Sequence, residues 1–482
     1  MLNRHKSLLL VVVWCCLSAL SAAGQTSPMS LSDCVRYALE NHPNVKVAQL
    51  QVADADWRVK ESKATGLPQL SAGLSYNYFI QRGGLPSSAL GFGASGPIDL
   101  SPALPSFSAD QAAELSRVFG SIFASDPDSK VYFNSVHGAS GSVSANQLIF
   151  NNSYLVALKA ARYYRQYVEL QLGAAKETVR NQVTDAYLPA LLLSENLAIL
   201  DKNIGNLDKL LSDTRAINKA GFAEQLDVDR LDLSLANLRS ERGNLARQRE
   251  IVVSALKMAM GMPVGTEISL SDDLNALLKT YADADLTTAV NPMNHPEYLQ
   301  LLKGRDLAAL QIDLYRKPWM PTVLGFVQWQ GGLQGGFGAK DSPTHNKWFF
   351  IPSAVAGLSV SVPLYDGGGS KAKRERALIQ VQTIDAQKQM LENAIQLQAE
   401  SARKQYANAA ERVSNQQKNL ALAQRIYDTT QTKYKAGIGS SFEITQAEQG
   451  LYSAQQALMT AQFDLLNAKV AIKKALGIST GQ

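Results

Sequence analysis

The chain has 482 residues, of which 46% are hydrophobic and 7% aromatic, and its 47 basic and 42 acidic residues give a formal net charge of +5. So small a charge does not predict a nucleic-acid partner, which would require a strongly basic surface. The sequence contains no Ser, His and Asp set, no phosphate-binding loop and no His, Cys or acidic cluster at metal-ligand spacing. It therefore predicts no enzyme, no metal site and no cofactor.

Residues 1–24 are typical of a signal peptide. Arg4 and Lys6 precede an apolar run from Leu8 to Leu20, and small residues follow it at 21–24. The apolar run is too short for a transmembrane helix of about 20 residues. Removal of the peptide lowers the net charge from +5 to +3 and leaves Cys34 as the remaining cysteine. We expect an exported chain without an intrachain disulfide and without a lipid anchor.

Helical segments are expected over 31–67, with a helix start at Asn41-His42-Pro43, because proline is favoured in the first helical turn. Apolar and polar residues then alternate over about 69–82 and again over 136–150, which predicts two strands with one wet face. Such alternation is more common in soluble sheets. The chain is nevertheless expected to be exported and to contain four long strands in all, and this context favours a sheet that crosses a membrane.

Two helices are expected next, over 153–219 and 222–260, separated by a turn at Lys219-Ala220-Gly221. In the first helix, apolar residues recur at steps of three or four, as in a coiled coil. At 1.5 Å per residue, such a helix is a rod of about 100 Å. It cannot be the interior of a compact globular domain.

The second half of the chain repeats the first, with a linker over 262–294 between repeats at 25–261 and 295–482. Lys435-Ala436-Gly437 follows Lys219-Ala220-Gly221 by 216 residues, and a further glycine stands forty residues after each turn glycine. The second repeat is expected to contain helices over 295–317, 368–435 and 439–476 and strands over about 322–334 and 351–364. A short loop from Gly331 to Lys347 would join those strands.

Segment lengths predict the architecture. In each repeat, the helix after the turn and the helix before the first strand together match the long rod, so they can stack end to end beside it. Four strands cannot close a barrel with a lumen, and an open sheet edge is not tolerated in lipid. The chain is therefore expected to oligomerise. A homotrimer with twelve strands and twelve helical struts is the natural small solution, although these lengths do not fix the number at three. Trp348-Phe349-Phe350 would belong to an interfacial aromatic belt.

The pattern resembles the TolC-like outer-membrane efflux proteins over essentially the whole mature chain. The resemblance rests on the paired Asn-His-Pro starts, on Pro-Leu-Tyr-Asp-Gly-Gly at 363–368, on Tyr434-Lys435-Ala436-Gly437 and on Ala475-Leu476-Gly477. It implies a trimeric channel, with a 12-stranded transmembrane β-barrel in outer-membrane lipid and an α-helical barrel in the periplasm. The implied partners are a periplasmic adaptor (membrane fusion) protein and an inner-membrane transporter, in efflux or type I secretion.

The resemblance also implies a periplasmic gate. Tyr434 corresponds to the family's tether tyrosine and Asp227 to its carboxylate partner. Glu443 corresponds to the first acidic ring, Gln446 occupies the position of the second, and Gly439 replaces a tether arginine. The adaptor would dock on the two tips, at Lys219, Ala220, Gly221, Lys435, Ala436 and Gly437.

Two alternatives remain open on sequence grounds. Asp227 and Glu443 could instead be first-turn carboxylates that stabilise helix starts through the helix dipole. As a whole, the chain could be an exported trimeric coiled-coil structural or adhesive protein without a pore, although such a stalk has no need of four alternating strands. The substrate is not predicted, because the pump selects what enters a passive duct.

Overall fold

The computed structural model describes residues 27–81, 83–86, 108–111, 113–114, 130–132, 136–221, 223–281, 289–335 and 348–478. The predicted signal peptide lies outside these residues. The chain divides into a unit made of Met1–Arg58, Ala160–Ile312 and Arg374–Gln482 and a unit made of Val59–Lys159 and Asp313–Lys373. The first contains most of the helices and the second contains the main sheet. The predicted fold class, mainly α with a separate set of long strands, is confirmed.

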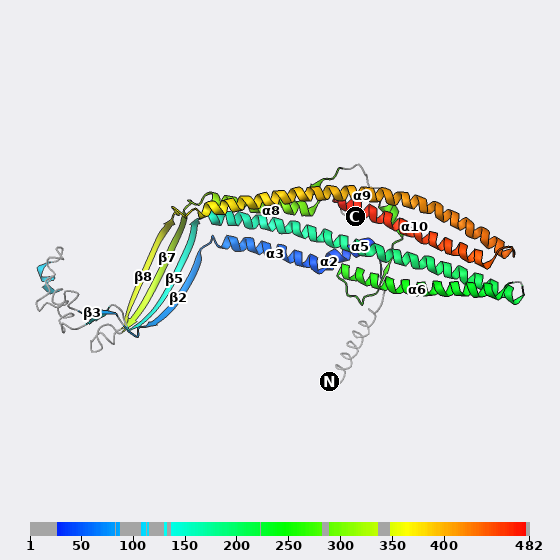
Figure 1. Ribbon diagram of the computed structural model, residues 1–482. Helices are drawn as coiled ribbons and strands as arrows, with labels where there is room; N and C mark the ends of the chain where they lie inside the picture. Colours follow the sequence, from blue (N-terminus) through cyan, green and yellow to red (C-terminus); the bar gives the residue numbers. More distant parts are fainter. Residues whose placement is uncertain are drawn as a thin grey trace, which may run out of the picture. The chain divides into compact units, whose positions relative to one another are not determined.

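The longest helices form two hairpins (Figure 1). Helix α5 (Asn152–Lys219) pairs with α6 (Gln225–Met260), and α9 (Gly369–Lys435) pairs with α10 (Ser441–Ala475). Ion pairs join the members of each hairpin across their exposed sides, at Asp201–Arg242, Asp208–Arg239, Arg215–Asp232 and Arg412–Asp464. Exposed pairs contribute little energy, so the buried apolar seam supplies most of the stability.

The apolar seam of α5 is buried as the heptad-like spacing predicted. Val179, Val183, Leu200, Leu207 and Leu211 all have exposed fractions of 2% or less. By length and composition alone, α5 contains a window apolar enough to cross a membrane. We attribute that apolar character to its buried face, which packs against other helices. Pro189 lies within the helix, where it removes one backbone donor.

Two shorter helices stack end to end with α6 and α10, as the segment lengths predicted. Helix α3 (Pro43–Ala64) starts at the end of α6, and α8 (Pro296–Arg316) starts at the end of α10. Gly261 ends α6 with φ of 71°, and a Cβ atom there would lie 3.0 Å from the Cα atom of His42. Gly477 ends α10 in the same way, and a Cβ atom there would lie 2.7 Å from the Cβ atom of Asn294. The glycine forty residues after each tip therefore permits the close junction of the helices.

In agreement with the helix start predicted at Asn41-His42-Pro43, the helical region 31–67 is two helices, α2 (Leu31–Asn41) and α3, and it ends at Ala64. His42 separates them with an extended backbone, φ −63° and ψ 130°. The cause is Pro43, because the residue before a proline is pushed out of the α region.

A small equatorial region lies between the repeats in sequence. Strand β1 (Ser27–Met29) pairs in parallel with β6 (Ile268–Leu270), and α7 (Leu274–Thr280) and the short 3₁₀ helix η4 (Pro292–Asn294) follow. Asp272 Oδ2 accepts hydrogen bonds from the Leu31 amide at 2.7 Å and from the Tyr187 hydroxyl at 2.9 Å. These bonds join the N-terminal segment, the linker and α5.

The main sheet contains β2 (Gln69–Tyr78), β5 (His137–Phe150), β7 (Thr322–Gly335) and β8 (Trp348–Ser361), in that order and all antiparallel (Figure 1). A small pair, β3 (Gly84–Pro86) and β4 (Lys130–Tyr132), is also present. The predicted loop from Gly331 to Lys347 is too long, because β7 continues to Gly335. Strand β8 begins and ends three residues earlier than predicted. Most of the long loop between β2 and β5 lies outside the described residues.

The register gives the sheet one apolar and one polar face, since directly paired residues lie on the same side. Leu74, Gly141, Gly331 and Pro352 form one row on the apolar face, and Ser71, Ser144, Gln328 and Val355 form one row on the polar face. The mixed pattern of β7 persists in the structure: Val327, Trp329 and Leu333 are on the apolar face, whereas the polar face carries Leu324 and Phe326 beside Gln328, Gln330 and Gln334. None of these four strands contains Asp, Glu, Lys or Arg.

An aromatic cluster lies on the apolar face at one end of the sheet. The Tyr76 hydroxyl oxygen lies 2.9 Å from His137 Nδ1, and the His137 ring stacks on Trp348 with centroids 5.9 Å apart. Tyr78 is 5.1 Å from the same imidazole. Rings with an apolar body and a polar tip suit the boundary between lipid and water. This position agrees with the belt expected at Trp348.

Candidate functional site

The candidate site is the region where the two hairpins turn. Helix α9 ends at Lys435, and the turn places Gly437 at φ 75°. Ile438 N donates to Lys433 O at 3.1 Å and Gly437 N to Tyr434 O at 3.0 Å, the bonding pattern of a Schellman motif. Gly221 has φ 83° in the turn after α5. The six predicted docking residues, Lys219, Ala220, Gly221, Lys435, Ala436 and Gly437, are all exposed.

Tyr434 joins the two hairpins. Its hydroxyl oxygen lies 3.0 Å from Thr214 Oγ1, so the last turn of α9 is bonded to α5. Thr214 is fully buried, and Tyr434 is half-buried against the apolar core of this region. A hydrogen bond between partly buried groups is protected from competition with water.

Asp227 also joins the hairpins, but through a different partner than the resemblance implied. Asp227 Oδ1 accepts a hydrogen bond from the Ser441 hydroxyl, which connects α6 to α10. The structure therefore does not bring Tyr434 onto Asp227. Both residues still act across the hairpins, each through a small hydroxyl residue that the sequence analysis did not single out. Ser441 is 1% exposed, so this bond is shielded from solvent.

Glu443 and Gln446 lie on the exposed side of α10. Glu443 is in the first turn, where its backbone N–H donates to the Oγ atom of the N-cap residue Ser440 at 3.2 Å. Asp227 is in the first turn of α6. Both carboxylates thus occupy positions that a helix dipole favours. Gln446 lines a cavity of about 370 Å³ between α6 and α10, together with Arg230, Leu233, Ser234, Asn237, Phe442, Thr445 and Gln449.

An apolar core lies next to these two bonds, and we call it the tip cluster. It draws on all four helices of the hairpins and consists of Leu207, Leu210, Leu211, Val228, Leu231, Leu235, Tyr427, Ile444, Ala447 and Leu451. The packing energy of a buried leucine is worth more than a single hydrogen bond. The contact between the two hairpins therefore depends on this core as well as on the polar bonds.

Further polar contacts between the hairpins occur away from the tips. Asn203 Nδ2 donates to Gln455 Oε1 at 2.9 Å, and Tyr452 donates to Glu241 at 3.2 Å. These pairs were missed because an exposed-looking Asn, Gln or Tyr on a long helix carries no signal that identifies its partner.

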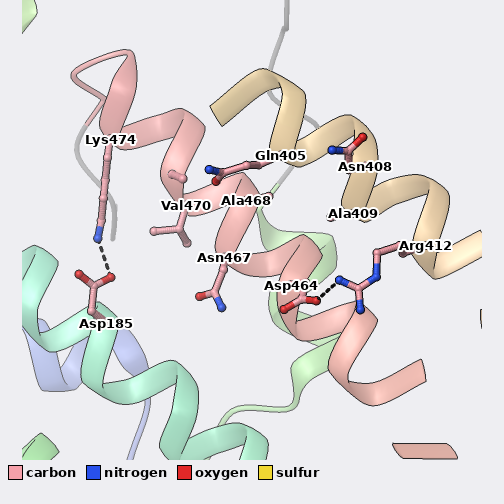
Figure 2. Close-up of a pocket in the computed structure, with 11 residues that line it drawn as sticks. Asp185, Gln405, Asn408, Ala409, Arg412, Asp464, Asn467, Ala468, Val470 and Lys474 are labelled. Carbon is pink, nitrogen blue, oxygen red and sulfur yellow. Dashed lines mark hydrogen bonds and ion pairs between the residues drawn. The ribbon is translucent and has the colours of Figure 1, made fainter. Parts of the chain in front are cut away.

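A charged cavity of about 570 Å³ lies between α9, α10 and α5 (Figure 2). Lys474 Nζ is 2.7 Å from Asp185 Oδ1, which ties α10 to α5. Arg412 lies 2.8 Å from Asp464, which ties α9 to α10. The amides of Gln405, Asn408 and Asn467 complete the lining. The charged groups of this cavity are paired with one another and serve to connect the helices.

The described part of the chain has no group of three or more His, Cys, Asp or Glu side chains placed to bind a metal ion. Cys34 is fully buried, and burial raises the pKa of its thiol to about 12. His42 is also nearly buried, and its Nδ1 accepts from the Asn44 amide at 3.1 Å. The Asn-His-Pro histidine thus takes part in a helix start, which agrees with the structural role that its sequence position suggested.

A sheet with one apolar and one polar face, together with two long duplicated helical hairpins, defines the class of channel proteins of the outer membrane. The model of the outer membrane efflux protein family matches residues 35–262 and 293–478. The chain belongs to this family, as the resemblance in the sequence predicted. It is an outer-membrane efflux channel protein that extends into the periplasm, and the family is made of channel proteins.

Individual relatives agree with this assignment. The pyoverdine export outer membrane protein OpmQ of Pseudomonas aeruginosa is 24% identical over 432 residues, which cover 86% of this chain and 86% of that protein. The antibiotic efflux pump outer membrane protein ArpC of Pseudomonas putida is 23% identical over 267 residues, 55% of this chain and 53% of that protein. The crystal structure of the outer membrane protein VceC from Vibrio cholerae is similar in fold. Its TM-score is 0.63 at 15% identity, covering 94% of this chain and 97% of that chain.

Proposed function

We propose that three copies of this chain form a passive export duct, opened at its periplasmic tips by an adaptor and an inner-membrane pump. The observation that carries the proposal is the main sheet, which has one apolar face, a second face that carries most of its serine and amide side chains, and no Asp, Glu, Lys or Arg in its four strands. Strands β2 and β8 are its edges. An open edge is not tolerated in lipid, so pairing of β8 with β2 of a second copy would close a barrel of twelve strands.

In such a barrel the apolar face contacts lipid and the polar face lines the lumen. Hydroxyls pair on the polar face, with Ser71 and Ser144 oxygens 2.8 Å apart and Ser75 and Ser140 oxygens 2.7 Å apart. Gln328, Gln330 and Gln334 add amides. Leu324, Phe326, Ile351 and Val355 share this face. Its hydroxyls and amides offer hydrogen bonds to a polar solute without selecting its charge. The relatives are named for cargoes as different as pyoverdine and antibiotics, which fits selection by the pump.

We assign the gate to the tip region. Tyr434 with Thr214 and Asp227 with Ser441 are the bonds that hold the hairpins together when the duct is closed. Glu443 would place three carboxylates around the axis of a trimer, and Gln446 would occupy a neutral second ring. The exposed turns at Gly221 and Gly437 would contact the adaptor. The support for these roles is the position of each residue at the ends of the hairpins.

Substitutions at two neighbouring residues of β7 distinguish an export duct from a structural protein without a pore. Trp329 is on the apolar face and Gln330 on the polar face. Trp329→Lys should prevent stable trimers in the outer membrane, because a lysine facing lipid at mid-membrane costs about 2–4 kcal/mol. Gln330→Lys, its matched control, should assemble as heat-modifiable trimers and shift the selectivity of single channels in planar bilayers towards anions. Trimers that remain water-soluble and do not conduct, or a Gln330→Lys channel with unchanged selectivity, would refute the proposal.

A further inference from the structure

Glu448 is a carboxylate in the middle of an apolar face. It lies in α10, four residues after Ile444 and three before Leu451, so the three side chains share one side of the helix. Both neighbours belong to the tip cluster. Glu448 itself is only 7% exposed. Its Oε2 atom has no hydrogen-bond partner in the part of the chain that the structure describes. An ionised carboxylate in such a place is costly unless it is paired.

The groups packed around Glu448 do not provide a counter-charge. Helix α9 presents Tyr427, whose hydroxyl accepts a hydrogen bond from Gln431 at 3.2 Å, with Asp428 beside it. The cluster residues of α5 and α6 are Leu and Val side chains. On those helices, Arg215 and Arg239 are paired with Asp232 and Asp208. Asp227 is bonded to Ser441. No ion pair to Glu448 is present among the described residues.

Burial raises the pKa of Glu448 from its ordinary value of 4.5 to about 7. It also raises the pKa of Tyr427, with a contribution from the charge of Glu448. When the tips separate, the carboxyl reaches water and its pKa returns towards the ordinary value. The closed tip therefore binds this proton more tightly than the open tip. Closure is favoured below the ordinary pKa, and this advantage is lost progressively as the pH rises to about 7.

We propose that Glu448 is a proton switch of the tip, which packs in the closed cluster when protonated and favours separation of the hairpins when ionised. This inference rests on the proposed duct and adds a regulation to it. The device needs no movement of the exposed ring at Glu443. It acts in the tip cluster, where α5, α6, α9 and α10 meet, so a change in its charge reaches both hairpins at once.

The test measures the open probability of purified trimers in planar bilayers between pH 5 and 9. In the wild type, the ratio of open to closed channels should rise with pH by on the order of a hundredfold per protomer, the size of a pKa difference of two to three units. Glu448→Gln, which is neutral and similar in shape, should remain closed and lose this pH dependence. Glu448→Asp should keep a transition, because it retains a titrating carboxyl. Glu411→Gln, an exposed carboxylate on α9, is the matched control and should behave as the wild type.

A second measurement does not depend on conduction. A spin label at Ala436→Cys should report longer distances between the tips of a trimer at pH 8 than at pH 5, and no change in the Glu448→Gln background. Native Cys34 should not interfere, because it is fully buried. A wild type that conducts with an open probability independent of pH, or a Glu448→Gln variant with the wild-type transition, would overturn the switch alone. Trimers whose label distances respond to pH but that never conduct would overturn the duct and not the switch.

Discussion

The first prediction concerns the hydrogen bond between Tyr434 and Thr214, whose donor can be assigned from the structure. The two hydroxyl oxygens are 3.0 Å apart, and Thr214 Oγ1 also lies 2.9 Å from the carbonyl oxygen of Leu210. A hydroxyl has one hydrogen and a carbonyl only accepts. Thr214 therefore donates to Leu210, and Tyr434 donates to Thr214.

Tyr434→Phe removes that donor without leaving a buried donor unpaired, because Thr214 keeps its bond to Leu210. The expected loss is the net value of one neutral hydrogen bond, about 0.5–1.5 kcal/mol per chain. If the three tips of a trimer open together, the closed state loses about 1.5–4.5 kcal/mol, which shifts the ratio of open to closed channels by about ten- to a thousandfold.

The assay is the open probability of single channels in planar bilayers, with Tyr365→Phe as the control. Tyr365 is 89% exposed and lies outside the tip, so its hydroxyl should have no effect. Thr214→Val removes the other side of the bond. In a double-mutant cycle, the two substitutions should be less than additive by about the value of the bond. Fully additive effects, or a Tyr434→Phe channel with wild-type open probability, would show that this bond does not hold the tips closed.

Three further predictions concern the tips and the equatorial region. Replacement of both Gly221 and Gly437 by valine should abolish export while trimers persist in the outer membrane, because a β-branched residue at positive φ distorts the docking turns; export at the wild-type rate would contradict the docking role. Glu443→Gln should weaken cation selectivity and block by trivalent cations in bilayers, because it removes three like charges from one ring; if both persist, the carboxylate serves only the helix start. Lys469→Met should destabilise α7 by about 1–3 kcal/mol, because it removes the donor to buried carbonyl groups. Lys469 Nζ lies 3.1 Å from the Leu278 carbonyl oxygen and 2.9 Å from that of Tyr281. Hydrogen exchange over 274–280 should accelerate, whereas the exposed Lys209→Met should leave it unchanged, and equal protection in both variants would contradict this role.

Most of the fold followed from local patterns that the sequence displays directly. The seam of α5 could be predicted because its apolar residues recur every three or four positions, and its end because a glycine must take the left-handed conformation. The stacking of α6 on α3 could be predicted from lengths and from the repeated glycines. The errors lie at boundaries. The helical region predicted over 31–67 ends at Ala64. Strand β7 extends into a predicted loop, to Gly335, because cross-strand pairing stabilises residues whose own alternation is weak.

The sequence predicted where the candidate site lies in the chain, but not which residues bond to one another there. Tyr434 and Asp227 were placed at the tips by the duplicated turns and by the resemblance. Their partners, Thr214 and Ser441, are 220 and 214 residues away in the chain, and small hydroxyl residues are common on helices. Glu448 is recognisable in the sequence as a charged residue between Ile444 and Leu451 on one side of α10. Its burial cannot be inferred from that position until the helices that pack against α10 are known.

The sequence by itself determined the duplicated plan of long helices and two-faced strands, because periodicity, helix-end glycines and prolines act over a few residues and need no distant contact. Only the tertiary structure decided which face of β7 is apolar, which hydroxyls bond the hairpins together and how deeply Glu448 is buried. Those properties depend on the register between strands and the rotation of helices about their axes. A shift of one residue in either changes every contact between elements while the local pattern stays the same.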